Sequence, residues 1–144
     1  MINSMASEQV AVVGAVDPDA YSAGTNTTAW ISAANFFTFL ALILVGDSGG
    51  VVDAKIEQAT DAAGTGVKDV AGKAITQLAG TSDNVQAAIN LRPEDLDVSN
   101  NFSHFRLSIT TGSTSDAGGL VLGSHPRHGP ASDNDAATVV EIIS

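Results

Sequence analysis

The stretch Phe36-Phe37-Thr38-Phe39-Leu40-Ala41-Leu42-Ile43-Leu44-Val45 is apolar at nearly every position and ends at Gly46-Asp47-Ser48-Gly49-Gly50. Read at a period of two, one side carries Phe37, Phe39, Ala41, Ile43 and Val45, and the other carries Phe36, Leu40, Leu42 and Leu44. A strand with two apolar faces needs a cover on each. One cover can be the core of the domain itself. We therefore expect the other cover to be a terminal arm, a second sheet or another subunit.

Shorter strand patterns surround this stretch. Residues 51–58 alternate apolar with charged side chains, which is typical of a half-buried strand with one solvated face. Residues 104–109 alternate in the same way, so Phe105, Leu107 and Ile109 are expected to face inward. Weaker patterns predict strands at residues 10–13, 67–70, 74–78, 85–91 and 117–122.

Gly, Ser, Asp and Asn turns separate these stretches, and no long segment has a helical period. This spacing predicts an all-β fold, a single antiparallel β-sandwich or barrel of about 7–8 short strands. Residues 1–28 are small and polar with a turn signal at Asp17-Pro18-Asp19, and are assigned to an N-terminal arm. The sandwich is assigned to residues 29–123, and a C-terminal arm to residues 124–144.

Composition excludes several functions. The 144 residues include no cysteine, six basic and sixteen acidic residues, for a formal net charge of -10. The few basic residues are scattered, which argues against binding to nucleic acid or anionic lipid. The longest apolar stretch is shorter than the ~20 residues of a helical membrane span. We expect no secretory signal, no membrane partner and synthesis in the cytoplasm.

Sequence motifs for cofactors and metals are incomplete. The segment Gly64-Thr65-Gly66-Val67-Lys68-Asp69-Val70-Ala71-Gly72-Lys73-Ala74 has the wrong glycine spacing for a phosphate loop and lacks the hydroxyl after its lysine. His125 and His128 could share a metal ion, but Pro126 between them disfavours a helix, so a solvated loop or subunit contact is the default. His104 is expected on the polar side of its strand. We predict no cofactor and no metal.

Acidic and serine-based sites are also not favoured. The pairs and triplets of acidic residues at 17–19, 94–97 and 133–135 do not reproduce a calcium-binding loop, and solvated turns are the better interpretation. No Gly-x-Ser-x-Gly elbow is present, although a triad assembled in three dimensions is not visible in sequence. The chain is predicted not to be an enzyme.

Three further stretches carry a resemblance to a known group of proteins. They are Val52-Asp53-Ala54-Lys55-Ile56-Glu57-Gln58-Ala59, Val67-Lys68-Asp69-Val70-Ala71-Gly72-Lys73-Ala74-Ile75-Thr76-Gln77-Leu78, and Phe105-Arg106-Leu107-Ser108-Ile109-Thr110 followed by Gly119-Leu120-Val121-Leu122-Gly123. In these stretches the chain resembles small β-sandwich structural proteins of tailed bacteriophages, similar to capsid decoration or cement proteins. The resemblance implies a virion protein on the outer surface of a capsid, with the major capsid protein as its partner and self-association as a dimer or trimer.

The resemblance implies no catalytic residues. The interface is predicted on the face of the strand at residues 36–45 that the core does not need, and in the C-terminal arm. The predicted residues are Phe36, Leu40, Leu42, Val139, Val140, Ile142 and Ile143. A head-tail connector or tail-tube component would share the fold and the arms. A ligand- or carbohydrate-binding module would need an exposed aromatic platform, which is hard to build from Trp30, Tyr21 and five phenylalanines, most of them in strand patterns.

Overall fold

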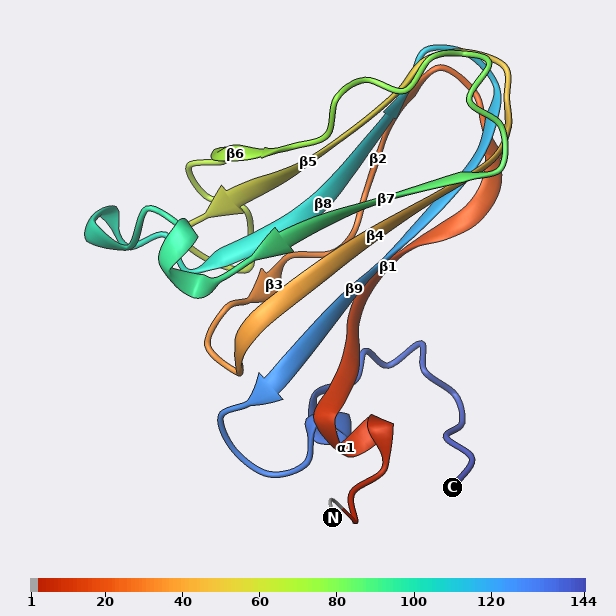
Figure 1. Cartoon of the computed structure of the whole chain (residues 1–144). Helices are drawn as coiled ribbons and strands as arrows, with labels where there is room; N and C mark the ends of the chain where they lie inside the picture. Colours follow the sequence, from red (N-terminus) through yellow and green to blue (C-terminus); the bar gives the residue numbers. More distant parts are fainter. Residues whose placement is uncertain (1–2) are drawn as a thin grey trace.

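The computed structural model describes residues 3–144, which fold into two antiparallel sheets packed face to face (Figure 1). The first sheet, sheet A, has the strand order β1-β9-β4-β7, and the second, sheet B, has the order β2-β8-β5-β6, with β3 also pairing with β8. The nine strands are β1 (Val10–Tyr21), β2 (Gly24–Thr27), β3 (Ile31–Ser32), β4 (Phe36–Ser48), β5 (Val52–Ala59), β6 (Lys68–Ala74), β7 (Val85–Leu91), β8 (His104–Thr111) and β9 (Ser115–Pro126). The predicted all-β sandwich is confirmed.

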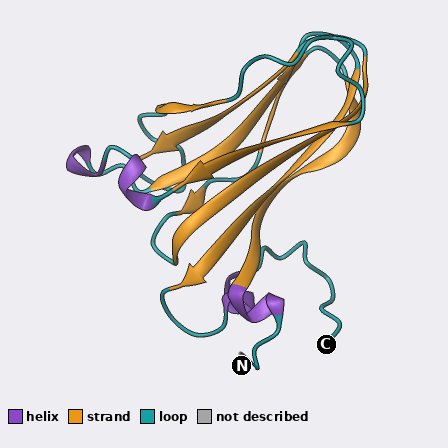
Figure 2. Ribbon diagram, in the orientation of Figure 1, coloured by secondary structure: helices purple, strands orange, loops and turns teal. Residues whose placement is uncertain are grey.

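Within residues 3–144, helix is limited to four short turns outside the strands. Figure 2 shows how little helix accompanies the two sheets. These are α1 (Ala6–Gln9) and the 3-10 turns η1 (Pro93–Asp95), η2 (Val98–Asn100) and η3 (Ala131–Asn134). None of the helices within residues 3–144 has the length and apolar character to cross a membrane.

The core lies between the two sheets, because each strand turns one set of alternating side chains inward. Three aromatic rings pack edge to face at its centre. The ring centroids of Phe36 and Phe39 lie 5.7 Å apart, and those of Phe39 and Phe105 lie 4.7 Å apart. A Cβ at Gly123 would lie 2.5 Å from the Phe36 ring, so the ring occupies the space that a side chain there would fill.

Strand β4 has two apolar faces, as its sequence predicts, but at its start Phe36 is 1% exposed and Phe37 is 53% exposed, the reverse of the predicted sides. Along its inner face, Phe39, Ala41, Ile43 and Val45 are buried in the core. The leucines between them point away from the core, and Leu44 is 47% exposed. Because β4 lies between β9 and β7, this outward face is central in sheet A.

The N-terminal arm predicted for residues 1–28 is wrong over most of its length. Met1 and Ile2 lie outside the described residues, but β1 and β2 belong to the two sheets. Strand β1 pairs with β9 from Val10 to Tyr21 and contains two register shifts. The second shift lies between Val16 and Asp19, so the predicted turn at Asp17-Pro18-Asp19 is a β-bulge inside a long strand.

Two strands were predicted over residues 67–78, and the structure forms only one regular strand there. Strand β6 pairs with β5, and the pairing is irregular between Lys55 and Glu57. Gly72 within β6 has a φ of 74°, which interrupts regular extended backbone. Residues 75–78 then continue along β5, with an isolated bridge between Leu78 and Val52.

The C-terminal arm begins later than predicted and is anchored to the sandwich. Strand β9 continues to Pro126, and η3 buries Ala131 completely. Beyond Asn134 the chain has no regular helix or strand. The Val12 N–H donates to the Asp135 carboxylate over 2.8 Å, and the Ala136 N–H donates to the Val12 carbonyl over 2.7 Å. The arm therefore joins the free edge of β1 at a single residue.

Strand β7 forms the opposite edge of sheet A. All its residues from Val85 to Leu91 pair with β4 in one continuous register, and within residues 3–144 no strand pairs with its other side. The strand contains no charged residue and no proline. It therefore lacks the features that usually protect a sheet edge from further pairing.

Candidate interaction surface

The outward side of sheet A is apolar across three neighbouring strands. Pairing places Leu42 beside Leu120 and Leu40 beside Leu122, and β1 then places Val12 beside Leu122. We call this surface the open face, and its residues are Val12, Ala15, Leu40, Leu42, Leu44, Leu120 and Leu122. Leu44 is 47% and Leu120 is 37% exposed. Large contiguous apolar patches are uncommon on monomeric proteins and mark sites of interaction.

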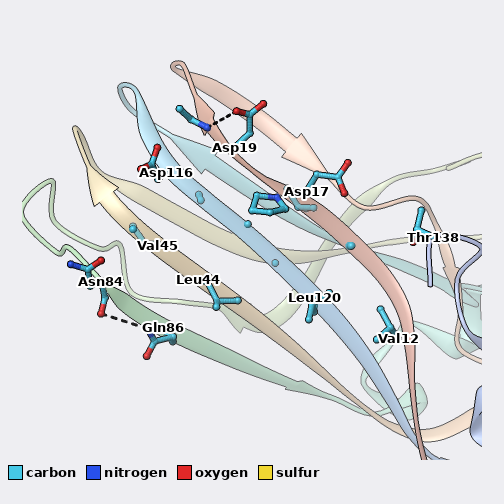
Figure 3. Close-up of a pocket in the computed structure, with 18 of the residues that line it drawn as sticks. Val12, Asp17, Asp19, Leu44, Val45, Asn84, Gln86, Asp116, Leu120 and Thr138 are labelled. Atoms are coloured by element: carbon cyan, nitrogen blue, oxygen red, sulfur yellow. Dashed lines mark hydrogen bonds between the residues drawn. The ribbon is translucent and has the colours of Figure 1, made fainter. Parts of the chain in front are cut away.

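A groove of about 920 Å³ lies over part of the open face (Figure 3). Leu44, Leu120 and Val12 provide apolar side chains from three strands. Asn84 and Gln86 line the groove on the β7 side. On the β1 side it is lined by Thr138 and Val139 of the C-terminal arm.

One end of the groove is acidic. Asp17, Asp19 and Asp116 line this end, and all three are exposed. The pairing of β1 with β9 places Asp19 near Asp116, since Asp19 lies opposite Ala117 and Asp116 opposite Ala20, while Asp17 lies within the preceding bulge of β1. Within the described part of the chain, none of the three carboxylates forms an ion pair.

The bulge in β1 shapes the acidic end. Pro18 lies against β9 at Gly118, where a Cβ would be only 3.0 Å from the Pro18 Cα, so the close approach favours a glycine. The Tyr21 hydroxyl donates a hydrogen bond to the Asp17 carbonyl. Partial burial raises the pKa of Tyr21, and the charges of Asp17 and Asp19 raise it further. The bulge thus holds two carboxylates near a tyrosine that stays neutral.

The outward side of sheet B is polar and its charges are paired. Arg106 donates to the Glu57 carboxylate over 2.7 Å, and Lys55 donates to Asp69 over 2.7 Å. The hydrogen bond to Asp69 is the main cause that raises the pKa of Lys55. The Lys73 ammonium nitrogen lies 3.3 Å from a carboxylate oxygen of Asp95. Unlike the open face, this surface has its charges satisfied within the chain.

Ion pairs and hydrogen bonds also account for the lowered pKa values of two carboxylates beside sheet B. Lys68 and the Asn100 amide both donate to Asp97, and these hydrogen bonds lower its pKa. At Asp95, burial raises the pKa, but hydrogen bonds from the Arg92 backbone N–H and from Lys73 outweigh it and lower the pKa overall. These shifts come from ordinary surface pairs and gather no group of catalytic side chains in one cleft.

The predicted interface residues separate into three groups. Leu40 and Leu42 lie on the open face, and Val139 lines the groove beside it. Phe36 is only 1% exposed and belongs to the core, because at the start of β4 its ring turns inward over Gly123. The other three predicted residues, Val140, Ile142 and Ile143, are exposed in the irregular arm and line no part of the groove.

Sequence reasoning left out several residues of this surface. Leu120 and Leu122 lie two residues apart in a predicted strand, so their alternation could have placed them on one face. Leu44 belongs to the same face of β4 as Leu40 and Leu42. At the acidic end, the pair Asp17 and Asp19 was visible in the sequence, but the nearby position of Asp116 gave no local signal, since it comes from a distant strand.

The other candidate sites of the sequence are dispersed. His125 lies at the end of β9 with a φ of 55°, while His128 lines a small pocket of about 260 Å³ with Asp133. Within residues 3–144, no three His, Cys, Asp or Glu side chains come close enough to hold a metal ion. His104 accepts or donates a hydrogen bond with the Ser103 hydroxyl on the outer side of β8.

The aromatic residues proposed for a carbohydrate platform are already engaged. The Arg106 guanidinium lies 4.5 Å from the centre of the Trp30 ring, and a Cβ at Gly64 would be 2.5 Å from the indole nitrogen. Phe37 is 53% exposed, but Arg127 lies 4.1 Å above its ring. These rings do not form a free stacking surface.

No family model matches the chain, and no curated protein matches it. Among solved structures, it is similar to one of Bacillus endospore appendages, described as disulfide-linked pili, with 14% identity, a TM-score of 0.46, and 87% of this chain and 98% of that chain covered. It is also similar to Broad Bean Stain Virus, with 10% identity, a TM-score of 0.45, and 90% and 96% covered. An empty particle of Cowpea Mosaic Virus is similar with 11% identity and a TM-score of 0.44, and the match covers 88% of this chain and 85% of that chain. These likenesses are too remote to assign a function.

Proposed function

We propose that this protein is a virion structural protein, a decoration or cement protein that binds the outside of a tailed-phage capsid and stabilises the shell. The open face is the observation that carries the proposal. It is apolar and partly exposed in the free chain, whereas the outward side of sheet B is polar with paired charges. A protein that binds a shell by one side and faces solvent by the other needs this asymmetry.

The physical advantage of such binding comes from mass action. A protein that binds the assembled lattice more tightly than the free subunits adds its binding free energy to the cost of disassembly. A shell repeats the same site many times, so contacts of moderate affinity are sufficient when they act together. The major capsid protein is the partner in this proposal, and dimers or trimers of the chain would strengthen attachment.

A head-tail connector or tail-tube component is the second candidate, because the bare edge of β7 suits a protein that pairs with its neighbours in a ring. Copy number separates the two functions. A decoration protein occupies most lattice sites, whereas a connector is present in few copies per particle.

The decisive experiment is quantitative mass spectrometry on gradient-purified particles from a culture that carries this gene. We expect the ratio of this chain to the major capsid subunit to approach the number of lattice sites. A few copies per particle would favour the connector instead. Absence from the particles would reject a virion role altogether.

Variants connect this measurement to the open face. Leu44→Glu places a charge in the apolar groove and is expected to reduce the bound copies at least about tenfold, because a buried unpaired charge opposes association. The matched control is Val67→Glu, which changes an equally exposed aliphatic residue, 50% exposed, in the loop before β6. Circular dichroism would verify that both variants fold. Equal binding by both variants would show that the open face is not the docking surface.

A further inference from the structure

We propose that the groove binds an extended segment of the partner in which aliphatic side chains are followed by a lysine or arginine. The inference rests on the proposed function, because it names the chemistry of the surface that the open face meets. Its basis is the order of chemistry along the groove, which runs from leucines to three carboxylates.

The apolar part of the groove fits aliphatic side chains. Leu44 and Leu120 project from neighbouring strands and are 47% and 37% exposed, so a partner can bury a large part of both. Ala15 and Val12 extend this surface across β1. On the other side, the amides of Asn84 and Gln86 can hydrogen-bond to the backbone of an extended segment.

The acidic end selects the charge of the partner. Asp17, Asp19 and Asp116 are exposed and belong to no ion pair in the described residues, as noted above. Five of the six basic residues pair elsewhere, at Lys55, Lys68, Lys73, Arg92 and Arg106, and the sixth, Arg127, lies over Phe37. Because the described part of the chain offers these three carboxylates no cation of its own, a basic side chain of a partner can pair with them and complement the charge of this end of the groove.

The same charges argue against a second copy of this chain as the occupant. The C-terminal arm is the obvious apolar segment, since Val139 already lines the groove and Val140 is 94% exposed. However, the arm contains Glu141 and has no lysine or arginine after Arg127. Inserting it along the groove would bring a carboxylate towards three others. The whole chain, with a net charge of -10, has the same disadvantage.

The test uses a display library of random short peptides selected on the immobilised full-length chain. We expect the recovered peptides to carry aliphatic residues followed by lysine or arginine. Binding of one synthesised peptide is then measured by fluorescence anisotropy. For the variant Asp17→Asn/Asp19→Asn/Asp116→Asn we expect at least about fivefold weaker binding, and weaker binding of the wild type at high salt.

A charge-matched control separates the groove from the overall charge. The variant Asp53→Asn/Asp69→Asn/Glu94→Gln removes the same number of carboxylates away from the groove, and its binding should stay close to that of the wild type. Peptides without basic residues, equal losses in both variants, or binding that survives Leu44→Glu would overturn the inference. If one of these results is found while the chain still occupies most lattice sites on particles, the inference about the groove is rejected and the proposed function stands. Basic peptides in the groove with no chain on particles would reject the proposed function alone.

Discussion

The outward sides of the two sheets follow the same alternation and have opposite chemistry. Strand β5 turns Asp53, Lys55 and Glu57 outward, and they bind Gln77, Asp69 of β6 and Arg106 of β8, respectively. Strand β4 turns Leu40, Leu42 and Leu44 outward at the same spacing, and the groove lies over Leu44. Both strands contribute equally buried residues to the core. Packing in the core therefore accounts only for the inward-facing residues of each strand. The outward-facing residues indicate what the strand contacts outside the core.

The largest expected effect compares how much the two faces of β4 contribute to the stability of the protein. Ile43 is fully buried and Leu44 is 47% exposed. We expect Ile43→Ala to cost about 2–5 kcal/mol of unfolding free energy, because it leaves a cavity in the core. Leu44→Ala should cost less than about 1 kcal/mol. Urea denaturation measures both, and equal losses would mean that the open face is covered in the free protein.

A smaller effect tests the paired charges of sheet B. Arg106 bonds Glu57 and also stacks on Trp30. Arg106→Gln is therefore expected to cost about 1–2 kcal/mol and to expose the indole, shifting its fluorescence to longer wavelength. Lys55→Gln is the milder control, since that lysine is more exposed. An unchanged fluorescence spectrum in Arg106→Gln would contradict the stacked arrangement.

The smallest effect is a pH dependence at Asp97. Hydrogen bonds from Lys68 and Asn100 hold its pKa below the unfolded value of about 3.9. The stabilisation is thus complete above that value and is lost as the pH falls through the lower pKa of the folded state. We expect Asp97→Asn to be less stable than the wild type at neutral pH, with the difference shrinking below about pH 4.

Denaturation at a series of pH values measures this difference. Asp116→Asn is the control on the opposite sheet, because that carboxylate forms no ion pair in residues 3–144. It should show no loss at neutral pH. A gap between Asp97→Asn and the wild type that persists at low pH would assign the effect to the altered side chain itself.

Strong hydrophobic patterns made the central strands predictable from sequence. Residues 51–58 and 104–109, where apolar and polar positions alternate, form β5 and β8, and the continuous apolar run of residues 36–45 forms β4. Only the start of the first strand, residues 10–13, was predicted, since the small residues that follow and Asp17-Pro18-Asp19 have the composition of a loop. Only the pairing with β9 shows that this segment is a strand with a bulge. The acidic end depends on the same pairing, which local alternation does not encode.

The bare edge of β7 has a consequence for handling the purified protein. Its seven residues are uncharged, free of proline and in an unbroken register with β4, next to the leucines of the open face. The strand of a second molecule could pair with the free backbone groups of this edge and bury the adjacent apolar surface at the same time. Such pairing leads to fibrils or precipitate at high concentration. Solubility should therefore rise when a natural ligand occupies the leucines, and charged residues introduced at Ala88 would protect stored samples without touching the core.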